Sequence, residues 1–450
     1  MNFPRSLSSI STLNLFARRQ FMSASREIGK AIVIRRELGW NGLWRAVRKR
    51  GSRLLHPGGY WDRYSEEARI FSTMMDFSPE DVERSLAVHK QNSGNVEIKS
   101  ITWFLPEFAH PYFGGIHTIL RFADYFARTK GVENRFVVLG SASESLISQR
   151  IGRSFPDLVR SPVQIFHLYE DLKDLEPCDA AVATLWATAY FLLRFNQVKR
   201  KFYFIQDYEP QFYPAGTISA QVEATYGFGY YGIANTPTLK EIYEEKSGST
   251  AEFFVPCVDT QIFHPAQEGN PDSPDICKIF FYGRPNHPRN GFELGAQALR
   301  ILKKRLGAKI RIVSAGEDWH PREHDLLGVV ENLGLLDYAE TAELYRSCQI
   351  GLVMMFTQHP SYLPFELMSS GCLVVTNRNP ATSWILINKE NCLLSESSAT
   401  CLADTLVEAV LNSDERERIT ENASQLIKEY YSDWNAQMEK IYRFMCDPGN

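Results

Sequence analysis

Residues 359–377, HPSYLPFELMSSGCLVVTN, contain a loop, a short helix and an apolar strand in immediate succession. Proline suits the first helical position and glycine suits the left-handed residue that ends a helix, so we expect a helix from Pro364 to just before Gly371. Leu363 is then the N-cap residue, and its side chain cannot accept hydrogen bonds from the first-turn amides. Those amides are left for water or an anionic ligand. Glu366, in the same turn, either compensates the helix dipole at the surface or belongs to a site.

The same alternation of apolar strand and amphipathic helix extends over most of the chain from Val96 onward. It predicts an α/β fold with two halves, each a parallel sheet covered by helices on both faces. We expect domains at residues 96–255 and 256–430, joined through FFVPCVDTQIFHP, with a basic helical extension at 1–95 and a helix at 431–450 that packs back on the first half. The predicted strands of the first half are IKSITWFLP, NRFVVLG, VQIFHLY, DAAVATL and KFYFIQD. The second half repeats the alternation of strands and helices in DICKIFFYGRP, NGFELGAQALRILKKRLG, AKIRIVSAGE, VVENLGLL, TAELYRSCQIGLVMM and residues 359–377.

Several residues follow predicted strands, where the ligands of open α/β sheets bind. Arg284 and Arg289 stand before a helix, and two guanidiniums beside helix amides suit a diphosphate. Gly114 and Gly115 lie at a strand-to-helix turn and let a ligand approach the backbone, while Gly316 lies in a second such turn. The alternatives are two solvated surface arginines and ordinary turn glycines.

Charge is unevenly distributed along the chain. The formal net charge is −4, but residues 1–55 carry 12 Lys and Arg against Glu27 and Glu37, a local +10. That segment resembles a mitochondrial transit peptide in composition, and it also suits a basic helix on an anionic membrane or a helix packed on the protein body. The longest uncharged apolar stretch, 180–193, is shorter than the roughly 20 residues of a membrane-spanning helix. With eight cysteines in no metal-like spacing, we expect a cytoplasmic protein, peripheral at most, with no metal, no cofactor and no nucleic-acid partner.

These motifs, in this order, resemble the retaining glycosyltransferases of family 4, which have the two-domain GT-B architecture. The resemblance covers roughly residues 98–430 and rests on the Gly-Gly turn, VPCVDTQIFHP, GRPNHPRNGFEL and YLPFELMSSGCLVVTN. In finer pattern, WFLPEF, GGIHTILRFADYF and FIQDYEPQFYPAG are similar to the WsaF-type rhamnosyltransferases of bacterial surface-polysaccharide assembly. The resemblance implies a dTDP-β-L-rhamnose donor, a glycan or lipid-linked glycan acceptor, and retention of configuration. It also implies that residues 96–255 form the acceptor-side domain and residues 256–430 the nucleotide-sugar-binding domain.

The resemblance also assigns roles to individual residues. Glu366 would bind a sugar hydroxyl of the nucleotide, close to the backbone of Leu363, Pro364 and Phe365. Arg284 and Arg289 would stabilise charge on the departing diphosphate without a metal. The family usually has a second glutamate eight residues earlier, where this chain has Gln358, and it usually has a catalytic histidine where this chain reads Thr184, Leu185, Trp186.

The absent histidine leaves the residue that acts on the acceptor open. Asp207 and Glu209 are the nearest ionisable groups, with His110 and His117 close to the glycine turn. Either carboxylate could orient or deprotonate the acceptor, or could be structural. We therefore expect a metal-independent glycosyltransferase. The alternatives are a nucleotide-sugar epimerase and a catalytically inactive, membrane-associated scaffold.

Overall fold

The computed structural model describes residues 60–111, 114–266 and 276–449. The chain divides into two compact units, residues 1–74 and 75–450. Within the described part of the first unit, Tyr60–Met74 form helix α2. The basic segment 1–55 lies outside the described residues. The second unit contains both predicted halves.

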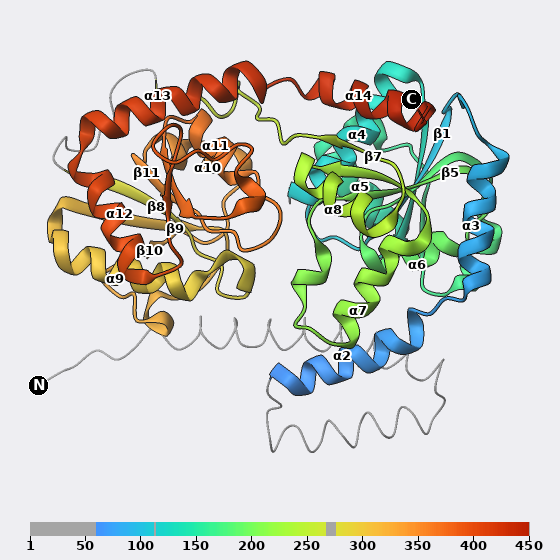
Figure 1. Ribbon diagram of the computed structural model, residues 1–450, viewed down its shortest axis with the longest axis horizontal. Helices are drawn as coiled ribbons and strands as arrows, with labels where there is room; N and C mark the ends of the chain where they lie inside the picture. The colour runs from blue at the N-terminus through green and yellow to red at the C-terminus, as the bar shows by residue number, and fades with distance from the viewer. Residues whose placement is uncertain (1–59, 112–113, 267–275, 450) are drawn as a thin grey trace, which may run out of the picture. The chain divides into compact units, whose positions relative to one another are not determined.

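The first half is built on a parallel sheet of seven strands in the order β3-β2-β1-β4-β5-β6-β7 (Figure 1). The central strand β1 is buried from Ile101 to Leu105, as expected for a parallel sheet covered on both faces. The strands are β1 (Ser100–Pro106), β2 (Glu133–Leu139), β3 (Val163–Phe166), β4 (Cys178–Ala183), β5 (Val198–Ile205), β6 (Tyr231–Asn235) and β7 (Ala251–Phe254). The helices are α3 (Pro79–Gln91), α4 (Gly114–Lys130), α5 (Glu144–Ser154), α6 (Trp186–Arg194), α7 (Thr217–Ala224) and α8 (Pro237–Ser247).

The second half repeats this construction with six parallel strands in the order β10-β9-β8-β11-β12-β13. The strands are β8 (Cys277–Tyr282), β9 (Ile310–Ala315), β10 (Glu331–Asn332), β11 (Ile350–Leu352), β12 (Leu373–Asn377) and β13 (Leu393–Ser395). The helices are α9 (Phe292–Leu306), α10 (Tyr338–Arg346), α11 (Leu363–Ser369), α12 (Ala399–Leu411) and α13 (Ser413–Tyr430). The predicted doubly wound α/β fold is therefore confirmed. Strands β6, β7 and β13 were not predicted, because each has only three to five residues and lacks a long apolar run.

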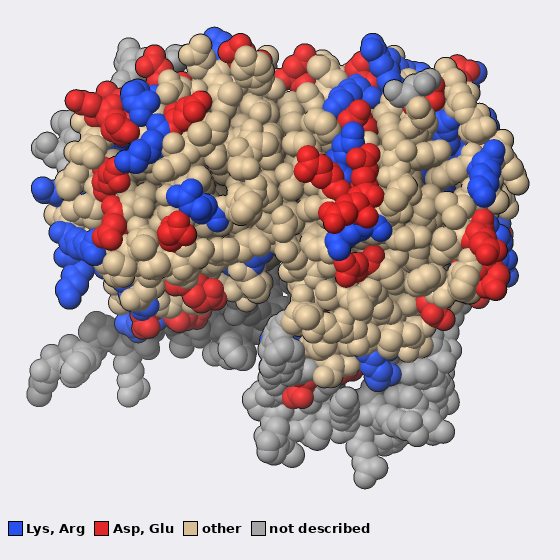
Figure 2. Space-filling model, viewed as in Figure 1, with Lys and Arg blue, Asp and Glu red and all other residues tan. Residues whose placement is uncertain are grey.

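The chain returns to the first half at its C-terminus. Helix α13 packs on the second half, and α14 (Trp434–Cys446) packs on α4 and β7 of the first (Figure 1). Tyr442 Oη donates to the carbonyl of Ile98 at 3.1 Å, and Lys440 pairs with Glu252 at 3.0 Å. On the face in Figure 2, acidic and basic side chains are interspersed along both helices, and mostly uncharged residues line the seam between the halves.

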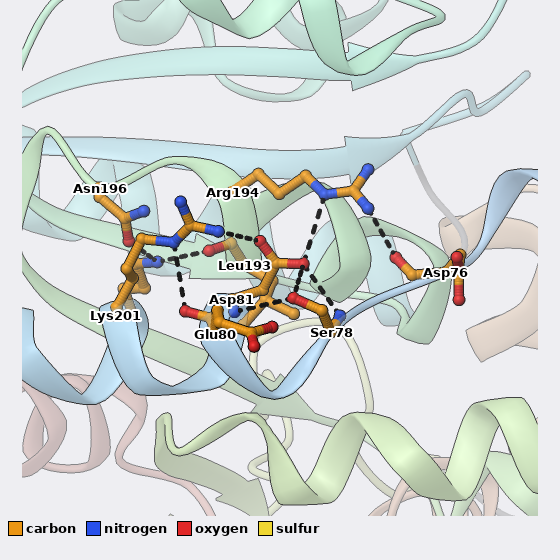
Figure 3. Close-up of polar contacts among 9 residues, drawn as sticks. Asp76, Ser78, Glu80, Asp81, Leu193, Arg194, Asn196 and Lys201 are labelled. Atoms are coloured by element: carbon orange, nitrogen blue, oxygen red, sulfur yellow. Dashed lines mark hydrogen bonds and ion pairs between the residues drawn. The ribbon is translucent and has the colours of Figure 1, made fainter.

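Helix α3 packs beside strand β5, where the amide of Lys201 donates to His89 Nε2 at 2.9 Å. Figure 3 shows further polar contacts of Lys201 and of Asp81 near the start of α3. Lys201 is fully buried, and its ammonium group donates to Asn196 Oδ1 at 2.7 Å and to the carbonyl of Leu193 at 3.1 Å. Burial lowers the pKa of Lys201 to about 7. Asp81 on α3 lies 3.9 Å from Arg194 Nε. These contacts hold β5 in position around Lys201. The carboxyl end of β5 leads into the candidate active site.

Candidate active site at the junction of the two halves

The two halves meet through hydrogen bonds between loops at the carboxyl ends of their strands. Thr357 Oγ1, beyond β11, donates to Asp207 Oδ2, beyond β5, at 2.9 Å. Thr238 Oγ1 on α8 donates to the carbonyl of Ala381 at 2.9 Å. Tyr362 Oη, from the second half, contacts two side chains of the first. The facing strand ends of the two sheets are therefore in direct contact, where the α/β architecture places ligands.

Helix α11 begins one residue earlier than the sequence predicts. Tyr362 is the N-cap residue, Leu363 is the first helical residue and Pro364 the second, so the prediction of Leu363 as the N-cap is wrong. Proline is tolerated at either position, because no amide of the first turn has an intrahelical partner. The cap makes no side-chain hydrogen bond, and Gly371 has a φ of 77°, as predicted for the residue that ends this helix. Pro364 and Phe365 are buried and Leu363 is half-buried.

Glu366 lies in the first turn of α11 and faces the protein interior. Among the described residues, its carboxylate has no hydrogen-bond or ion-pair partner, and burial raises its pKa to about 7. The charge of Glu366 adds to burial in raising the pKa of the phenols of Tyr338 and Tyr345 on α10. A half-buried carboxylate without a protein partner is costly unless a ligand supplies hydrogen bonds to it. This argues against Glu366 as a surface acid that only compensates the dipole.

Arg284 is held at the carboxyl end of β8 by two neighbours. Its Nη1 donates to Tyr282 Oη at 3.0 Å and its Nη2 to His287 Nε2 at 2.6 Å, while its buried Nε has no hydrogen-bond partner among the described residues. Gly316 has a φ of 122°, and a Cβ there would approach Tyr282 Cε2 at 2.7 Å and Arg284 Cγ at 3.3 Å. Glycine at position 316 is therefore required for the placement of the arginine.

Arg289 faces the first half. Its guanidinium carbon lies 4.7 Å from the centroid of the Phe212 ring, a cation–π contact between the halves. Burial lowers its pKa, and the charge of Asp207 opposes that shift. Repulsion from the Arg284 charge lowers the pKa of Arg289 further. Two adjacent cations at a strand end favour an anionic ligand that compensates both.

Asp207 and Glu209 both bind protein groups. Asp207 accepts hydrogen bonds from Thr357 and from the amide of Tyr208, and burial raises its pKa to about 6. Glu209 is 4% exposed and accepts from the amide of Trp186, the first residue of α6, at 2.7 Å. Burial raises its pKa to about 8. Glu209 thus fixes the start of α6, whereas Asp207 lies at the junction itself.

The predicted glycine turn is packed against side chains that the sequence analysis missed. A Cβ on Gly114 would lie 3.5 Å from Tyr362 Cδ2, and a Cβ on Gly115 would lie 3.2 Å from Gln206 Nε2. Gln206 directly follows β5, and Asn235 is the last residue of β6. Both positions are strand ends, so the rule that selected the arginines could have found Gln206, had its uncharged side chain been considered.

The loop before α11 contributes another residue that was missed. His359 is 5% exposed, and burial together with the charge of Arg289 lowers its pKa to about 3. Its Nδ1 accepts a hydrogen bond from the amide of Ser361 at 2.9 Å, and Ser361 has the uncommon φ of 68°. Gln358, next to it, is half-buried. His117, by contrast, pairs with Arg121 on its own helix.

Two features of residues 60–111, 114–266 and 276–449 concern metals and membranes. These residues contain no cluster of three or more His, Cys, Asp or Glu arranged to hold a metal ion. None of their helices has the length and apolar character needed to cross a bilayer.

The fold and the site together define a two-domain protein of the GT-B class. Anabaena HepE, solved in complex with UDP and glucose, superposes with a TM-score of 0.60 at 12% identity, over 77% of this chain and 99% of that one. Sucrose-phosphate synthase from Thermosynechococcus elongatus gives a TM-score of 0.58 at 13% identity, over 77% and 98% of the two chains. At such identities the likeness concerns the fold alone.

Sequence comparison identifies the family. The model of the WsaF N-terminal domain matches residues 105–236, and that of the WsaF C-terminal domain matches residues 277–407. The chain belongs to the WsaF family. A relative from Myxococcus xanthus, the O-antigen biosynthesis protein RfbC, is 40% identical over 428 residues, which are 95% of this chain and 32% of that protein. The chain thus spans about a third of that relative's length.

Proposed function

We propose that this protein is a glycosyltransferase that moves a sugar from a nucleotide diphosphate to a glycan of a surface polysaccharide. The observation that carries the proposal is a group of three charged residues near the junction. Arg284 has an unpaired Nε, Arg289 contacts the ring of Phe212, and the Glu366 carboxylate has no hydrogen-bond partner among the described residues. Two cations suit a diphosphate, and a buried carboxylate suits a hydroxyl group. The WsaF family membership and the O-antigen relative support the same class of substrate.

In the proposed reaction, the bond between the sugar C1 and the diphosphate oxygen breaks and its electron pair leaves with the diphosphate. The acceptor hydroxyl oxygen then bonds to C1. Arg284 and Arg289 compensate the negative charge that develops on the leaving group, with no role for a metal. Of the two candidate carboxylates, Asp207 is the better placed to orient the acceptor and take its proton, because it lies at the junction and its charge acts on Arg289. Glu209 acts on this site through α6.

The identity of the sugar is the finer part of the proposal. From the sequence resemblance we propose dTDP-β-L-rhamnose as donor, transferred with retention by an enzyme of family 4. The nucleotide then offers a deoxyribose, whose 3′-hydroxyl can bond to Glu366, near the backbone of Leu363, Pro364 and Phe365. The glycine turn at Gly114 and Gly115, with Gly316 and Gln358, completes the proposed substrate site. We propose that the acceptor is lipid-linked, so that the enzyme works at the inner face of the plasma membrane.

A binding screen tests the proposal. Isothermal titration calorimetry with dTDP-rhamnose, UDP-glucose and GDP-mannose, each compared with its free nucleoside diphosphate, should identify one nucleotide that binds. Binding of none would support the inactive scaffold instead. Conversion of the donor into an isomeric nucleotide sugar without an acceptor, measured by NMR, would support the epimerase.

A further inference from the structure

Three polar atoms at the junction lie out of contact with solvent and without a hydrogen-bond partner among the described residues. They are Gln206 Oε1, Asn235 Oδ1 and His359 Nε2. Asn235 is fully buried and His359 is 5% exposed. Buried side-chain polar atoms in proteins usually have a partner. The described residues contain further atoms without one, such as Arg284 Nε and His117 Nδ1, but these three lie around Tyr362, where the two halves meet. None of the three atoms takes part in the contacts described above.

Gln206 packs on the glycine turn at the start of α4, and Tyr362, which packs on the same turn, contacts Asn235 and lies near His359. Gln206 packs on Gly115, and it follows Ile205, which is paired with Ala234 immediately before Asn235. The ring of Tyr362 packs on Gly114, and its centroid lies 6.0 Å from that of His359. One region therefore contains the ends of β5 and β6, the glycine turn and the loop before α11.

A directed chain of hydrogen bonds fixes the orientation of the Asn235 amide. Thr118 Oγ1 donates to the carbonyl of Gly114 at 2.7 Å, so its contact with Tyr362 Oη at 2.8 Å must be one in which the tyrosine donates. Tyr362 Oη then accepts from Asn235 Nδ2 at 3.0 Å. Because the amide nitrogen of Asn235 is used in this chain, the carbonyl oxygen is the atom left unpaired.

The hydrogen bond from Ser361 likewise fixes the tautomer of His359. Nδ1 accepts that bond and the ring is neutral, so the proton of the imidazole is on Nε2. The region therefore presents two unpaired acceptors, Gln206 Oε1 and Asn235 Oδ1, and one unpaired donor, the His359 Nε2–H. A phosphate offers acceptors only and would not satisfy two acceptors, whereas a sugar hydroxyl both donates and accepts.

We propose that Gln206, Asn235 and His359 bind the hydroxyl groups of the sugar of the nucleotide-sugar donor. This inference rests on the proposed function and adds the sugar subsite to it. The site explains how a chain with Gln358 in place of a carboxylate can still hold a sugar. We assign the donor sugar to this site instead of an acceptor sugar for two reasons. His359 is adjacent to Gln358, and the charge of Arg289, a proposed diphosphate ligand, acts on His359.

Solvent does not reach the three atoms when the halves are in contact, so the sugar must bind before the halves close. Closure without a sugar leaves all three groups buried and unpaired. A nucleotide sugar should therefore favour closure more than the nucleoside diphosphate alone, because only the sugar satisfies these groups.

The test compares variants for their affinity toward a nucleotide sugar and toward the matching nucleoside diphosphate. The variants are Gln206→Met, Asn235→Ala and His359→Phe, and calorimetry is done with dTDP-rhamnose and dTDP, or with whichever pair the parent binds. Each variant should lose about tenfold or more in affinity for the nucleotide sugar and less than about twofold for the diphosphate. Thr238→Val is the matched control, since it removes a hydrogen bond between the halves away from the three residues.

Other outcomes would overturn the inference in distinguishable ways. Equal losses for both ligands, or a loss confined to the KM of the acceptor, would remove these residues from the donor sugar site. Unchanged sugar affinity with raised thermal stability would show that the unpaired atoms are only imperfect packing. A parent protein that binds neither ligand of any pair would overturn the proposed function and this inference together.

Discussion

The two halves share one construction but differ in what they place at their strand ends. In the second half, the candidate residues Arg284, Arg289 and Glu366 are charged. Arg284 Nε and the Glu366 carboxylate have no hydrogen-bond partner among the described residues, and Arg289 contacts the ring of Phe212. At the strand ends of the first half, Asp207 and Glu209 are hydrogen-bonded to protein groups, and the amide oxygens of Gln206 and Asn235 have no partner among the described residues. In the function proposed above, the charged residues of the second half bind the diphosphate, whereas the uncharged amides of the first half bind the sugar together with His359 of the second half.

The largest effect on binding is expected from Arg289→Ala. Loss of a charged hydrogen bond typically costs about 1–3 kcal/mol, so affinity for the nucleoside diphosphate should fall roughly tenfold to a hundredfold. Calorimetry with the diphosphate measures this, and Arg289→Lys should recover part of the loss by keeping the charge.

Arg378→Ala is the control for Arg289, because Arg378 is an exposed arginine of the same half and pairs with Glu396. If Arg289→Ala and Arg378→Ala bind the diphosphate equally well, the second half is not the charged side of the site and the comparison between the halves fails.

The Glu366→Gln substitution should change how the stability of the protein depends on pH. Burial raises the pKa of Glu366 to about 7 from an unfolded value of 4.5, so the folded state binds more protons between those values and stability falls as pH rises through this window. The Glu366→Gln variant does not lose stability in this way. As the pH rises from 4.5 to 8, its free energy of unfolding should therefore increase by about 1–3 kcal/mol relative to that of the parent.

Thermal melts of parent and Glu366→Gln across this pH range measure the difference, and the comparison cancels the titration of Asp207 and Glu209 in both proteins. Nucleotide affinity at pH 8 should be lower in the variant. A constant difference in melting temperature across the range would mean that Glu366 titrates normally and is solvated.

More candidate site residues could be proposed from the sequence in the second half than in the first. Arg284, Arg289 and Glu366 follow from local rules: each stands at a strand end or in a helix's first turn, and its charge marks it. Gln206, Asn235 and Tyr362 have no such mark, because their significance depends on contacts between residues far apart in the chain, such as Asn235 and Tyr362. The N-cap was misplaced by one residue because Tyr362 and Leu363 are equally poor side-chain caps.

The Tyr362→Phe substitution should have a smaller effect than Arg289→Ala or Glu366→Gln. It removes only the hydroxyl group through which Tyr362 contacts the first half. The change removes the hydrogen bonds of Tyr362 Oη with Asn235 Nδ2 and Thr118 Oγ1 and should lower stability by about 1–2 kcal/mol. It should also reduce the stabilisation that a nucleotide sugar gives, measured as the shift in melting temperature on adding the ligand.

Tyr190→Phe is the matched control for Tyr362→Phe. Tyr190 Oη is a buried hydroxyl that donates to the carbonyl of Gln221 within the first half, so its loss should lower stability without changing the ligand-induced shift. Identical ligand-induced shifts in the two variants would mean that Tyr362 does not couple closure to binding.

The smallest effect on transfer is expected from deleting residues 1–55, since the proposed chemistry resides wholly in the two halves. The deletion removes the formal +10 of that segment. Binding to anionic phosphatidylserine vesicles should fall, most clearly at low salt, where charges are least screened. Transfer to a short soluble acceptor should continue at the parental rate. A soluble, active truncation that still binds vesicles would disprove the membrane role, whereas an insoluble one would show that Ile32, Trp40 and their neighbours cover apolar surface.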